Sequence, residues 1–336
     1  VLLLSFASLV SGLAEGTLTR GPYVQLAHEN GITVVWRVVD ATDNPSVRYW
    51  QEGSKEVKIC RGNAILRRTE KSKLALSKAP KGTVQYEAHL AGLSPDTAYR
   101  YSVHDGDATL VEGAPEYRFT THPPRGVPTP ARIWVVGDSG TGEAHQRLVH
   151  EAMVRYTVAT RPLDFYLHVG DMAYGQGTDD QFQKKFFEPY QETLRHTVCW
   201  GSMGNHEGHS SDGKKGVGPF YDAYVSPTRG EAGGLASKKE SYYSFDYGDI
   251  HVICLNSHDV DRKPDGDMAT WLRKDLAATE ARWIIGYWHH PPYTKGTHDS
   301  DKEVQLVEMR QYIMPILEEG GVDLVLSGHS HIYERS

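Results

Sequence analysis

Hydrophobic and polar residues follow two different patterns along this chain, and the pattern changes near residue 131. Up to residue 121, short runs rich in β-branched and aromatic residues lie between turn residues, as in an all-β domain. From residue 131, short apolar runs alternate with longer segments of helical periodicity, which favours an α/β arrangement. We therefore expect a small all-β sandwich domain followed by a larger α/β domain.

The N-terminal part is expected to contain strands at residues 32–39, 46–51, 84–93 and 98–106. Residues 93–103, LSPDTAYRYSV, resemble a pattern of fibronectin type III domains, in which a tyrosine closes one corner of the sandwich. We expect this domain over residues 18–121 and a stiff proline-rich linker over 122–130. The domain is either a packing partner for the second domain or a module that binds carbohydrate or another partner, and we favour the packing role.

The second domain, over residues 131–336, is expected to alternate buried strands with helices. The expected strands are residues 131–137, 163–170, 195–204, 249–257, 282–290 and 322–328. The expected helices are residues 143–159, 179–195, 268–281 and 302–320.

A short polar segment that contains Gly or Pro lies at the end of most of these strands. The segments are GDSG (137–140), GDMAY (170–174), GNHE (204–207), HHPPY (289–293) and GHSHIYER (328–335). Loops beyond the carboxyl ends of strands meet at one edge of an α/β sheet. Carboxylates, a phenol, an amide oxygen and imidazoles are ligands of hard and borderline metal ions. The sequence therefore predicts a metal site at that edge.

The individual residues also have structural interpretations. Asp138 or Asp171 alone fits a turn or a helix cap, which is a common use of Asp. Asn205 fits a left-handed backbone position, and Tyr174 fits a packed aromatic. We interpret His168, which precedes one of the GD pairs, as an ordinary strand residue rather than a ligand.

In this order, the five segments resemble the binuclear metallophosphoesterases. Within that group, a tyrosine three positions after the aspartate, here Tyr174 after Asp171, makes the pattern similar to that of the purple acid phosphatases. The segments HIYERS (331–336) and YYSFDYGDIHVICLNS (242–257) are also similar to that family. The resemblance covers roughly residues 131–336 and implies a four-layer αββα sandwich for the α/β domain.

The resemblance also implies a ligand set. One metal ion would be bound by Asp138, Asp171, Tyr174 and His331. The other would be bound by Asp171, Asn205, His289 and His329, so that Asp171 bridges the two. Either imidazole of the HHP segment could face the metal, and the H-x-P-x-Y frame selects His289 over His290. The implied cofactors are Fe(III) and a divalent ion, which is Fe, Zn or Mn.

These ions explain the expected chemistry. With two carboxylates, a phenolate and a bridging hydroxide, the pair keeps a net positive charge that attracts a phosphate dianion. Two ions can activate a hydroxide that attacks phosphorus and can stabilise the leaving group. We expect a hydrolase of phosphate monoesters, of the acid phosphatase type. The alternatives are a phosphodiesterase or nucleotide pyrophosphatase on the same site, or a catalytically dead surface binding protein.

Other polar residues have weaker assignments. The resemblance places His206 against the phosphate, and His298 near a histidine pair of plant-type relatives, where we expect a proton donor. Asp299 stands at the second position of that pair, a departure that puts the donor role in doubt. The loop 208–241 carries four lysines that either cap the substrate or are merely solvated, and we favour solvation. They are Lys214, Lys215, Lys238 and Lys239.

The composition of the chain restricts the classes of molecule that it is expected to bind. The net charge of −7 argues against a general polyanion binder, and no Lys/Arg block is long enough for nucleic-acid recruitment. A small phosphorylated molecule is the expected substrate. Cys60, Cys199 and Cys254 do not make a disulfide framework, although a bond between the last two is left open.

The first residues predict export. VLLLSFASLV followed by SGLAEG resembles the apolar region and cleavage zone of a secretory signal peptide, with cleavage after Ala14. The apolar run is too short for the ~20 residues that a membrane-spanning helix needs. We therefore expect residues 1–14 to be part of a signal and the protein to be secreted or periplasmic. The family's domain normally extends further, so we also expect the chain to end before that domain does.

Overall fold

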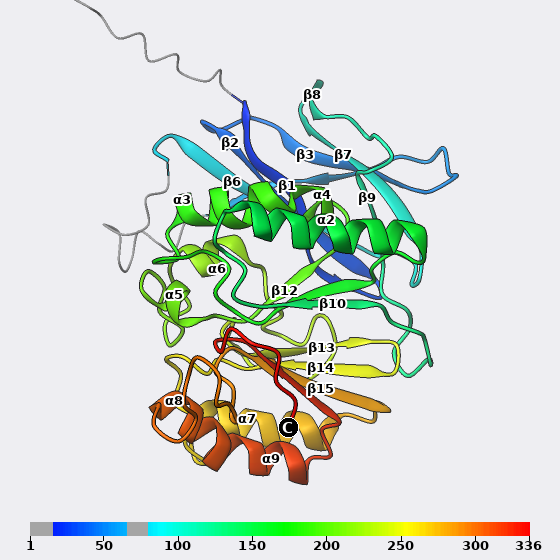
Figure 1. Ribbon diagram of the computed structural model, residues 1–336. Helices are drawn as coiled ribbons and strands as arrows, with labels where there is room; N and C mark the ends of the chain where they lie inside the picture. Colours follow the sequence, from blue (N-terminus) through cyan, green and yellow to red (C-terminus); the bar gives the residue numbers. More distant parts are fainter. Residues whose placement is uncertain (1–15, 66–79) are drawn as a thin grey trace, which may run out of the picture.

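The computed structural model describes residues 16–65 and 80–336. An all-β unit lies at one end of the molecule, and a layered α/β unit forms the rest (Figure 1). The predicted signal segment lies outside the described residues. Within the described ranges, no helix is both long and apolar enough to cross a bilayer.

The N-terminal unit is a sandwich of two antiparallel sheets. One sheet has the order β1–β2–β6–β5, formed by Leu18–His28, Gly31–Val39, Thr83–Ala91 and Asn63–Ile65. The other has the order β4–β3–β7–β8, formed by Lys58–Arg61, Pro45–Gln51, Ala98–Asp105 and Ala108–Val111, and β9 (Arg118–Thr120) also pairs with β7. The Tyr99 hydroxyl accepts a hydrogen bond from the Ser94 amide at 2.9 Å, so a tyrosine does tie this corner.

The α/β unit contains two further sheets. The first is the parallel sheet β10–β11–β12, formed by Ile133–Val136, Phe165–His168 and Cys199–Gly201. The second is β13–β14–β15–β16, formed by Tyr243–Tyr247, Ile250–Cys254, Trp283–Trp288 and Leu324–Ser327. Only the β13–β14 pair of these sheets is antiparallel.

The two sheets of the α/β unit pack through aromatic side chains. The Trp200 and Phe245 rings are stacked with centroids 4.0 Å apart. The Tyr243 hydroxyl lies 3.0 Å from the Tyr287 hydroxyl and donates a hydrogen bond to the Gly201 carbonyl. These contacts join strands of both sheets and bury the polar ends of the tyrosines with partners, as buried hydroxyls require.

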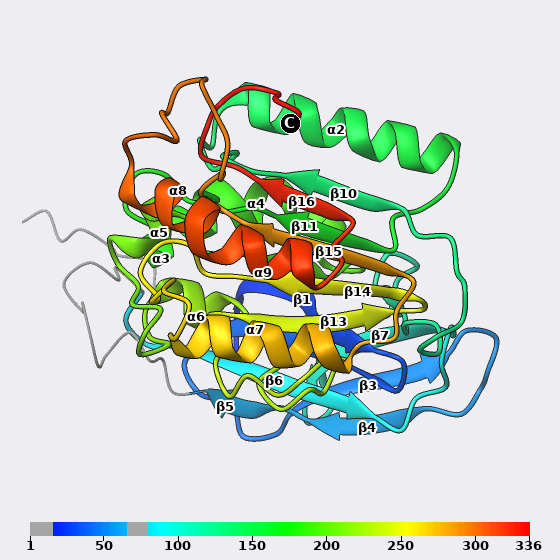
Figure 2. The ribbon, with the colours of Figure 1, turned by 90° about the horizontal axis from the view of Figure 1, so that it is seen from below.

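Helices cover the outer face of each sheet, which completes the four-layer αββα sandwich (Figures 1 and 2). The first sheet carries α2 (Ala144–Ala159) and a continuous helical run of α3, η2 and α4, which are Asp179–Phe182, Gln183–Phe187 and Glu188–Leu194. The second sheet carries α7 (Asp267–Ala278) and the run of α8, η3 and α9, which are Val304–Glu308, Met309–Ile313 and Met314–Glu319. Two short helices, α5 (Asn205–Gly208) and α6 (Pro219–Ala223), lie in the loop after β12.

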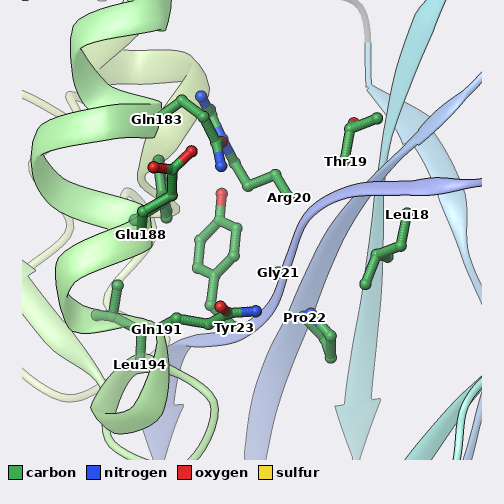
Figure 3. A pocket seen from close by; sticks show the side chains of 11 residues that line it. Leu18, Thr19, Arg20, Gly21, Pro22, Tyr23, Gln183, Glu188, Gln191 and Leu194 are labelled. Carbon is green, nitrogen blue, oxygen red and sulfur yellow. The ribbon is translucent and has the colours of Figure 1, made fainter.

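The two units are joined by a buried charge cluster. The Arg37 guanidinium donates to both oxygens of Asp179, at 2.8 and 2.6 Å, and Arg20 lies 3.1 Å from the same carboxylate. Arg20 also donates to Gln183 at 2.8 Å, across a pocket of about 220 Å³ between β1 and the helical run that contains α4 (Figure 3). The Tyr23 hydroxyl donates to a carbonyl of α6. The N-terminal unit therefore packs firmly on the α/β unit.

All three cysteines are free thiols. Cys199 and Cys254 are both buried in the α/β unit, where the Cys254 thiol donates to the Gly201 carbonyl at 3.6 Å. The bond between these two residues that the sequence left open is therefore not formed.

Candidate metal centre

The five polar segments all lie at one edge of the paired sheets. Asp138 follows β10, Asp171 follows β11, and Asn205 begins α5 directly after β12. His289 follows β15, and His329 follows β16. Because these strands run parallel to one another within each sheet, their carboxyl ends bring the loops together.

Glycine is needed in these segments because the ligand side chains occupy the space of a Cβ atom. A Cβ at Gly204 would lie 2.1 Å from Asp171 Oδ1, and one at Gly328 would lie 2.4 Å from Asp138 Oδ2. Asp138, Asp171 and His329 themselves have φ angles of 53°, 55° and 68°. A non-glycine residue in the left-handed region is uncommon and gathers at functional sites.

Three donor atoms form one cluster. The Tyr174 hydroxyl lies 3.4 Å from Asp138 Oδ1 and 3.1 Å from His331 Nε2. His331 Nε2 is in turn 3.4 Å from Asp138 Oδ1. Burial and the nearby Asp138 and Asp171 carboxylates raise the pKa of Tyr174 well above its ordinary value.

Four donor atoms form a second cluster around His289, which is fully buried. His289 Nε2 lies 2.9 Å from Asn205 Oδ1, 3.2 Å from His329 Nδ1 and 3.3 Å from Asp171 Oδ2. The other ring nitrogen, Nδ1, donates a hydrogen bond to the Val169 carbonyl at 2.8 Å. In the neutral ring, Nε2 therefore carries the lone pair that can bind a metal ion.

The pKa values of His289 and Asp171 are shifted in opposite directions by their contact. Burial alone would lower the pKa of His289, but the Asp171 and Asp138 carboxylates outweigh it and raise this pKa to about 9. Burial would raise the pKa of Asp171, but His289 and the His206 amide lower it to about 2. The carboxylates beside His289 therefore favour a positive charge in this cluster, which a bound cation would supply in place of a proton on the ring.

The donor spacing fits metal ions. Ligand atoms about 2.0–2.2 Å from an ion, at right angles to one another, lie ~3 Å apart. The contacts in the two clusters run from 2.9 to 3.4 Å. Asp138, Asp171 and His289 also offer atoms that all lie within 4.8 Å of one another, which connects the clusters. The seven residues therefore suit two adjacent ions, with Asp171 between them.

Sequence reasoning gave no role to Glu207, the last residue of the GNHE segment. Its completely buried carboxylate accepts hydrogen bonds from the amides of Asp171, Met172, Ala173 and Gly204, at 2.9 to 3.1 Å. Burial and the Asp171 charge raise the pKa of Glu207 to about 7. This side chain fixes the loop that carries Asp171, and its position three residues after Gly204 in α5 is the only signal for it in the sequence.

His290 and His168 each have one ring nitrogen against a serine hydroxyl, although His290 also lies beside His289 and His329. His290 is buried, and its Nδ1 lies 2.9 Å from the Ser257 hydroxyl. His168 Nε2 lies 2.9 Å from the Ser139 hydroxyl. The choice of His289 as the ligand of the HHP segment stays a prediction, because His290 also offers an atom within 4.8 Å of His289 and His329.

His206 and His298, to which the sequence assigned contacts with the substrate, lie beside the clusters on different candidate ligands. His206 Nδ1 donates to the Gly175 carbonyl at 2.9 Å, and its Nε2 lies 3.8 Å from Asp171. The His298 ring is stacked on the His329 ring with centroids 3.7 Å apart. Glu303, which the sequence did not single out, contacts both His298 and His329.

The lysines of the loop 208–241 form a separate surface. Lys215, Lys238 and Lys239 line a pocket of about 490 Å³ that contains none of the seven candidate ligands. Lys215 pairs with Asp212 at 3.2 Å. That these lysines are solvated and do not cap the substrate stays a prediction.

Comparisons with known proteins match both units. A family model described as calcineurin-like phosphoesterase matches residues 131–333, and one described as the purple acid phosphatase N-terminal domain matches residues 20–121. Purple acid phosphatase 18 of Arabidopsis thaliana is 28% identical over 330 residues, covering 94% of this chain and 65% of that protein. A purple acid phosphatase of Glycine max is 27% identical over 327 residues, covering 95% of this chain and 64% of the relative.

A bacterial relative also matches most of this chain. An uncharacterised protein of Mycobacterium tuberculosis is 26% identical over 333 residues, covering 91% of this chain and 59% of that protein. This chain thus spans less than two thirds of the length of each of these relatives.

Proposed function

We propose that this chain, which belongs to the calcineurin-like phosphoesterases and carries a purple acid phosphatase N-terminal domain, hydrolyses phosphate monoesters with two metal ions. The observation that carries the proposal is the convergence of seven donor side chains from five loops, with contacts of 2.9 to 3.4 Å. These residues would hold two adjacent ions, whose chemistry would be to activate water and to stabilise negative charge on the phosphoryl oxygens.

The two clusters suit different ions. A phenol, a carboxylate and an imidazole make the first cluster, and a phenolate with a carboxylate favours a trivalent ion such as Fe(III). Two imidazoles, an amide oxygen and a carboxylate make the second, which suits a divalent ion such as Fe, Zn or Mn. Asp171 would bridge the ions, because its carboxylate contacts His289 of the second cluster and also lies within 4.8 Å of a ligand atom of Asp138 in the first.

The residues around the clusters have matching roles. His206, anchored through Nδ1 on the Gly175 carbonyl, would donate from Nε2 to a phosphate oxygen when the ring is in its imidazolium form. His298 is held at Nδ1 by Glu303, so that its Nε2 would protonate the leaving oxygen when the ring is in its imidazolium form. Glu207 acts indirectly, since it holds the three amides of the loop that begins with Asp171.

A comparison of two substrates tests this function. The purified chain should hydrolyse nitrophenyl phosphate, and bis(nitrophenyl) phosphate far more slowly. A chelator should abolish both reactions, and the metal ions should restore them. A higher kcat/KM for the diester would replace the proposal by a phosphodiesterase, and protein that binds metal but cleaves neither ester would point to a surface binding role.

We also propose export. The apolar run of residues 2–10 and the small residues Gly12 and Ala14 support a cleaved signal. When the protein is expressed with its complete leader, its N-terminal residue outside the cytoplasm should be Glu15. Recovery only inside the cell, with the leader attached, would contradict export.

A further inference from the structure

Glu303 occupies a position from which one carboxylate reaches two imidazoles. It directly precedes α8. Its Oε1 accepts the Asp299 amide at 3.0 Å, and both of its oxygens lie 3.0 Å from His298 Nδ1. Its Oε2 lies 3.2 Å from Nε2 of His329. The amide and the two rings thus hold this side chain in one orientation.

The contact with His329 decides which nitrogen of that ring carries the hydrogen. An ionised carboxylate only accepts hydrogen bonds, so Nε2 of His329 must be the N–H that faces Glu303. In the neutral ring, Nδ1 then keeps its lone pair. That atom lies 3.2 Å from His289 Nε2, inside the second donor cluster.

His289 is prepared in the same manner from the other side. The Val169 carbonyl accepts the Nδ1 hydrogen at 2.8 Å, which leaves Nε2 unprotonated in the neutral ring. Two hydrogen-bond acceptors outside the cluster therefore turn two imidazole lone pairs toward one point. One acceptor is a backbone carbonyl that no substitution removes, and the other is Glu303.

We propose that Glu303 is a positioning residue that selects the His329 tautomer and so retains the ion of the second cluster. This inference rests on the proposed dinuclear function and deepens it. Removing such an outer partner typically weakens metal binding by ~10–100-fold. Among the described residues, the hydrogen bonds of the Glu303 carboxylate go to His298, Asp299 and His329, and none joins it to the three residues of the first cluster. The expected loss is therefore confined to one ion.

Metal release from the purified chain tests the inference without turnover. Wild type, Glu303→Ala and Glu303→Gln, each loaded with two ions, are exposed to a chelator, and the metal that remains is measured over time. Glu303→Ala should lose the ion of the second cluster about 10–100 times faster than wild type. The ion of the first cluster should leave at the wild-type rate. Glu303→Gln should recover part of the retention, because its amide oxygen still accepts from His329.

Two further variants identify the contact responsible. Asp301→Asn alters a neighbouring carboxylate that contacts Lys295 and Arg310, and it should release both ions at wild-type rates. His298→Ala removes the other imidazole partner of Glu303 and should also retain both ions. Equal acceleration of both ions in Glu303→Ala, or no acceleration, would overturn the inference. Wild-type protein that never binds two ions would instead contradict the proposed function.

Discussion

Three candidate ligands are held by hydrogen bonds to backbone groups. The Asp171 carboxylate accepts the His206 amide at 3.0 Å, and Asp138 accepts the His329 amide at 2.8 Å. Val169 orients the ring of His289. Such outer contacts prepare the geometry in advance, so that binding an ion requires little rearrangement.

Asp171 and His290 should separate metal binding from packing. Asp171→Ala removes the proposed bridge and should lose both ions and nearly all activity. His290→Ala should keep both ions, but it should lower the free energy of unfolding by about 2–4 kcal/mol, because a buried ring and its bond to Ser257 are lost. Metal analysis and denaturant unfolding of the two variants measure these effects.

The opposite pattern would be informative. If His290→Ala lost more metal than Asp171→Ala, the ring that faces Ser257 would have to turn toward the ions, and His289 would be the wrong choice.

His298 should matter most for poor leaving groups. General acid catalysis is worth ~10²–10⁴ in rate when the leaving oxygen needs a proton, and little when it does not. His298→Ala should therefore slow hydrolysis of an alkyl phosphate by at least ~10²-fold more than that of nitrophenyl phosphate. An equal loss on both substrates, with metal retained, would indicate phosphate binding instead of proton donation.

Side chains with a role in the site were predictable only where the local sequence reveals their chemistry. The proposed donors lie in short polar segments that follow strands, so their positions could be predicted, and the structure brings the seven into two clusters. Glu207 and Glu303 look like ordinary helix-start residues in the sequence. Their roles depend on which amides and rings the fold brings against them, and this information is not local.

At the scale of elements, α7 is joined to the second sheet by a buried histidine. His251 of β14 lies 2.6 Å from Asp246 of β13 and 2.9 Å from Asp275 of α7. Burial would lower the pKa of His251, but these two carboxylates outweigh it and raise it to about 9. Arg125 also faces Asp246, at 3.5 Å.

The stability of the fold should therefore fall at alkaline pH. Because the folded pKa of His251 lies above its unfolded value near 6.5, its contribution is complete below pH 6.5 and is lost as pH rises through about 9. The free energy of unfolding should decrease by up to about 3 kcal/mol over this range. His251→Gln should reduce the slope, to which the raised pKa of His289 also contributes in metal-free protein, whereas His145→Gln, on the exposed face of α2, should keep it in full. An unchanged slope in His251→Gln would contradict this assignment.

Most elements of the α/β unit could be predicted, and the exceptions have physical reasons. The expected helices 179–195 and 302–320 exist, but each contains a π-helical turn, η2 and η3, which depends on packing rather than on periodicity. The expected strand 195–204 shrinks to Cys199–Gly201, since its ends are loops that carry the site. β13 was not expected, because five residues that contain Asp and Ser give too weak a strand pattern.

At the scale of the molecule, the units are joined by two arginines and one carboxylate. Asp179→Asn would leave Arg20 and Arg37 buried without a counter-charge, since within the described part of the chain both arginines form their ion pairs with this carboxylate. Breaking a buried pair in this way costs about 3–5 kcal/mol. The free energy of unfolding of Asp179→Asn should fall by that amount.

The neighbouring residue provides the control. Asp180 pairs with Lys184 at the surface, at 3.0 Å, and such pairs contribute about 0–1 kcal/mol. Asp180→Asn should therefore have almost no effect. Equal losses in the two variants would mean that the cluster does not hold the units together.

The central claim is that seven side chains, from loops at the edge of two sheets, hold a pair of metal ions. Metal analysis of the purified, active chain tests it most directly. The account predicts two ions per chain, with phosphatase activity that disappears when they are removed and returns when they are restored. Fully active protein that contains one ion or none would contradict it.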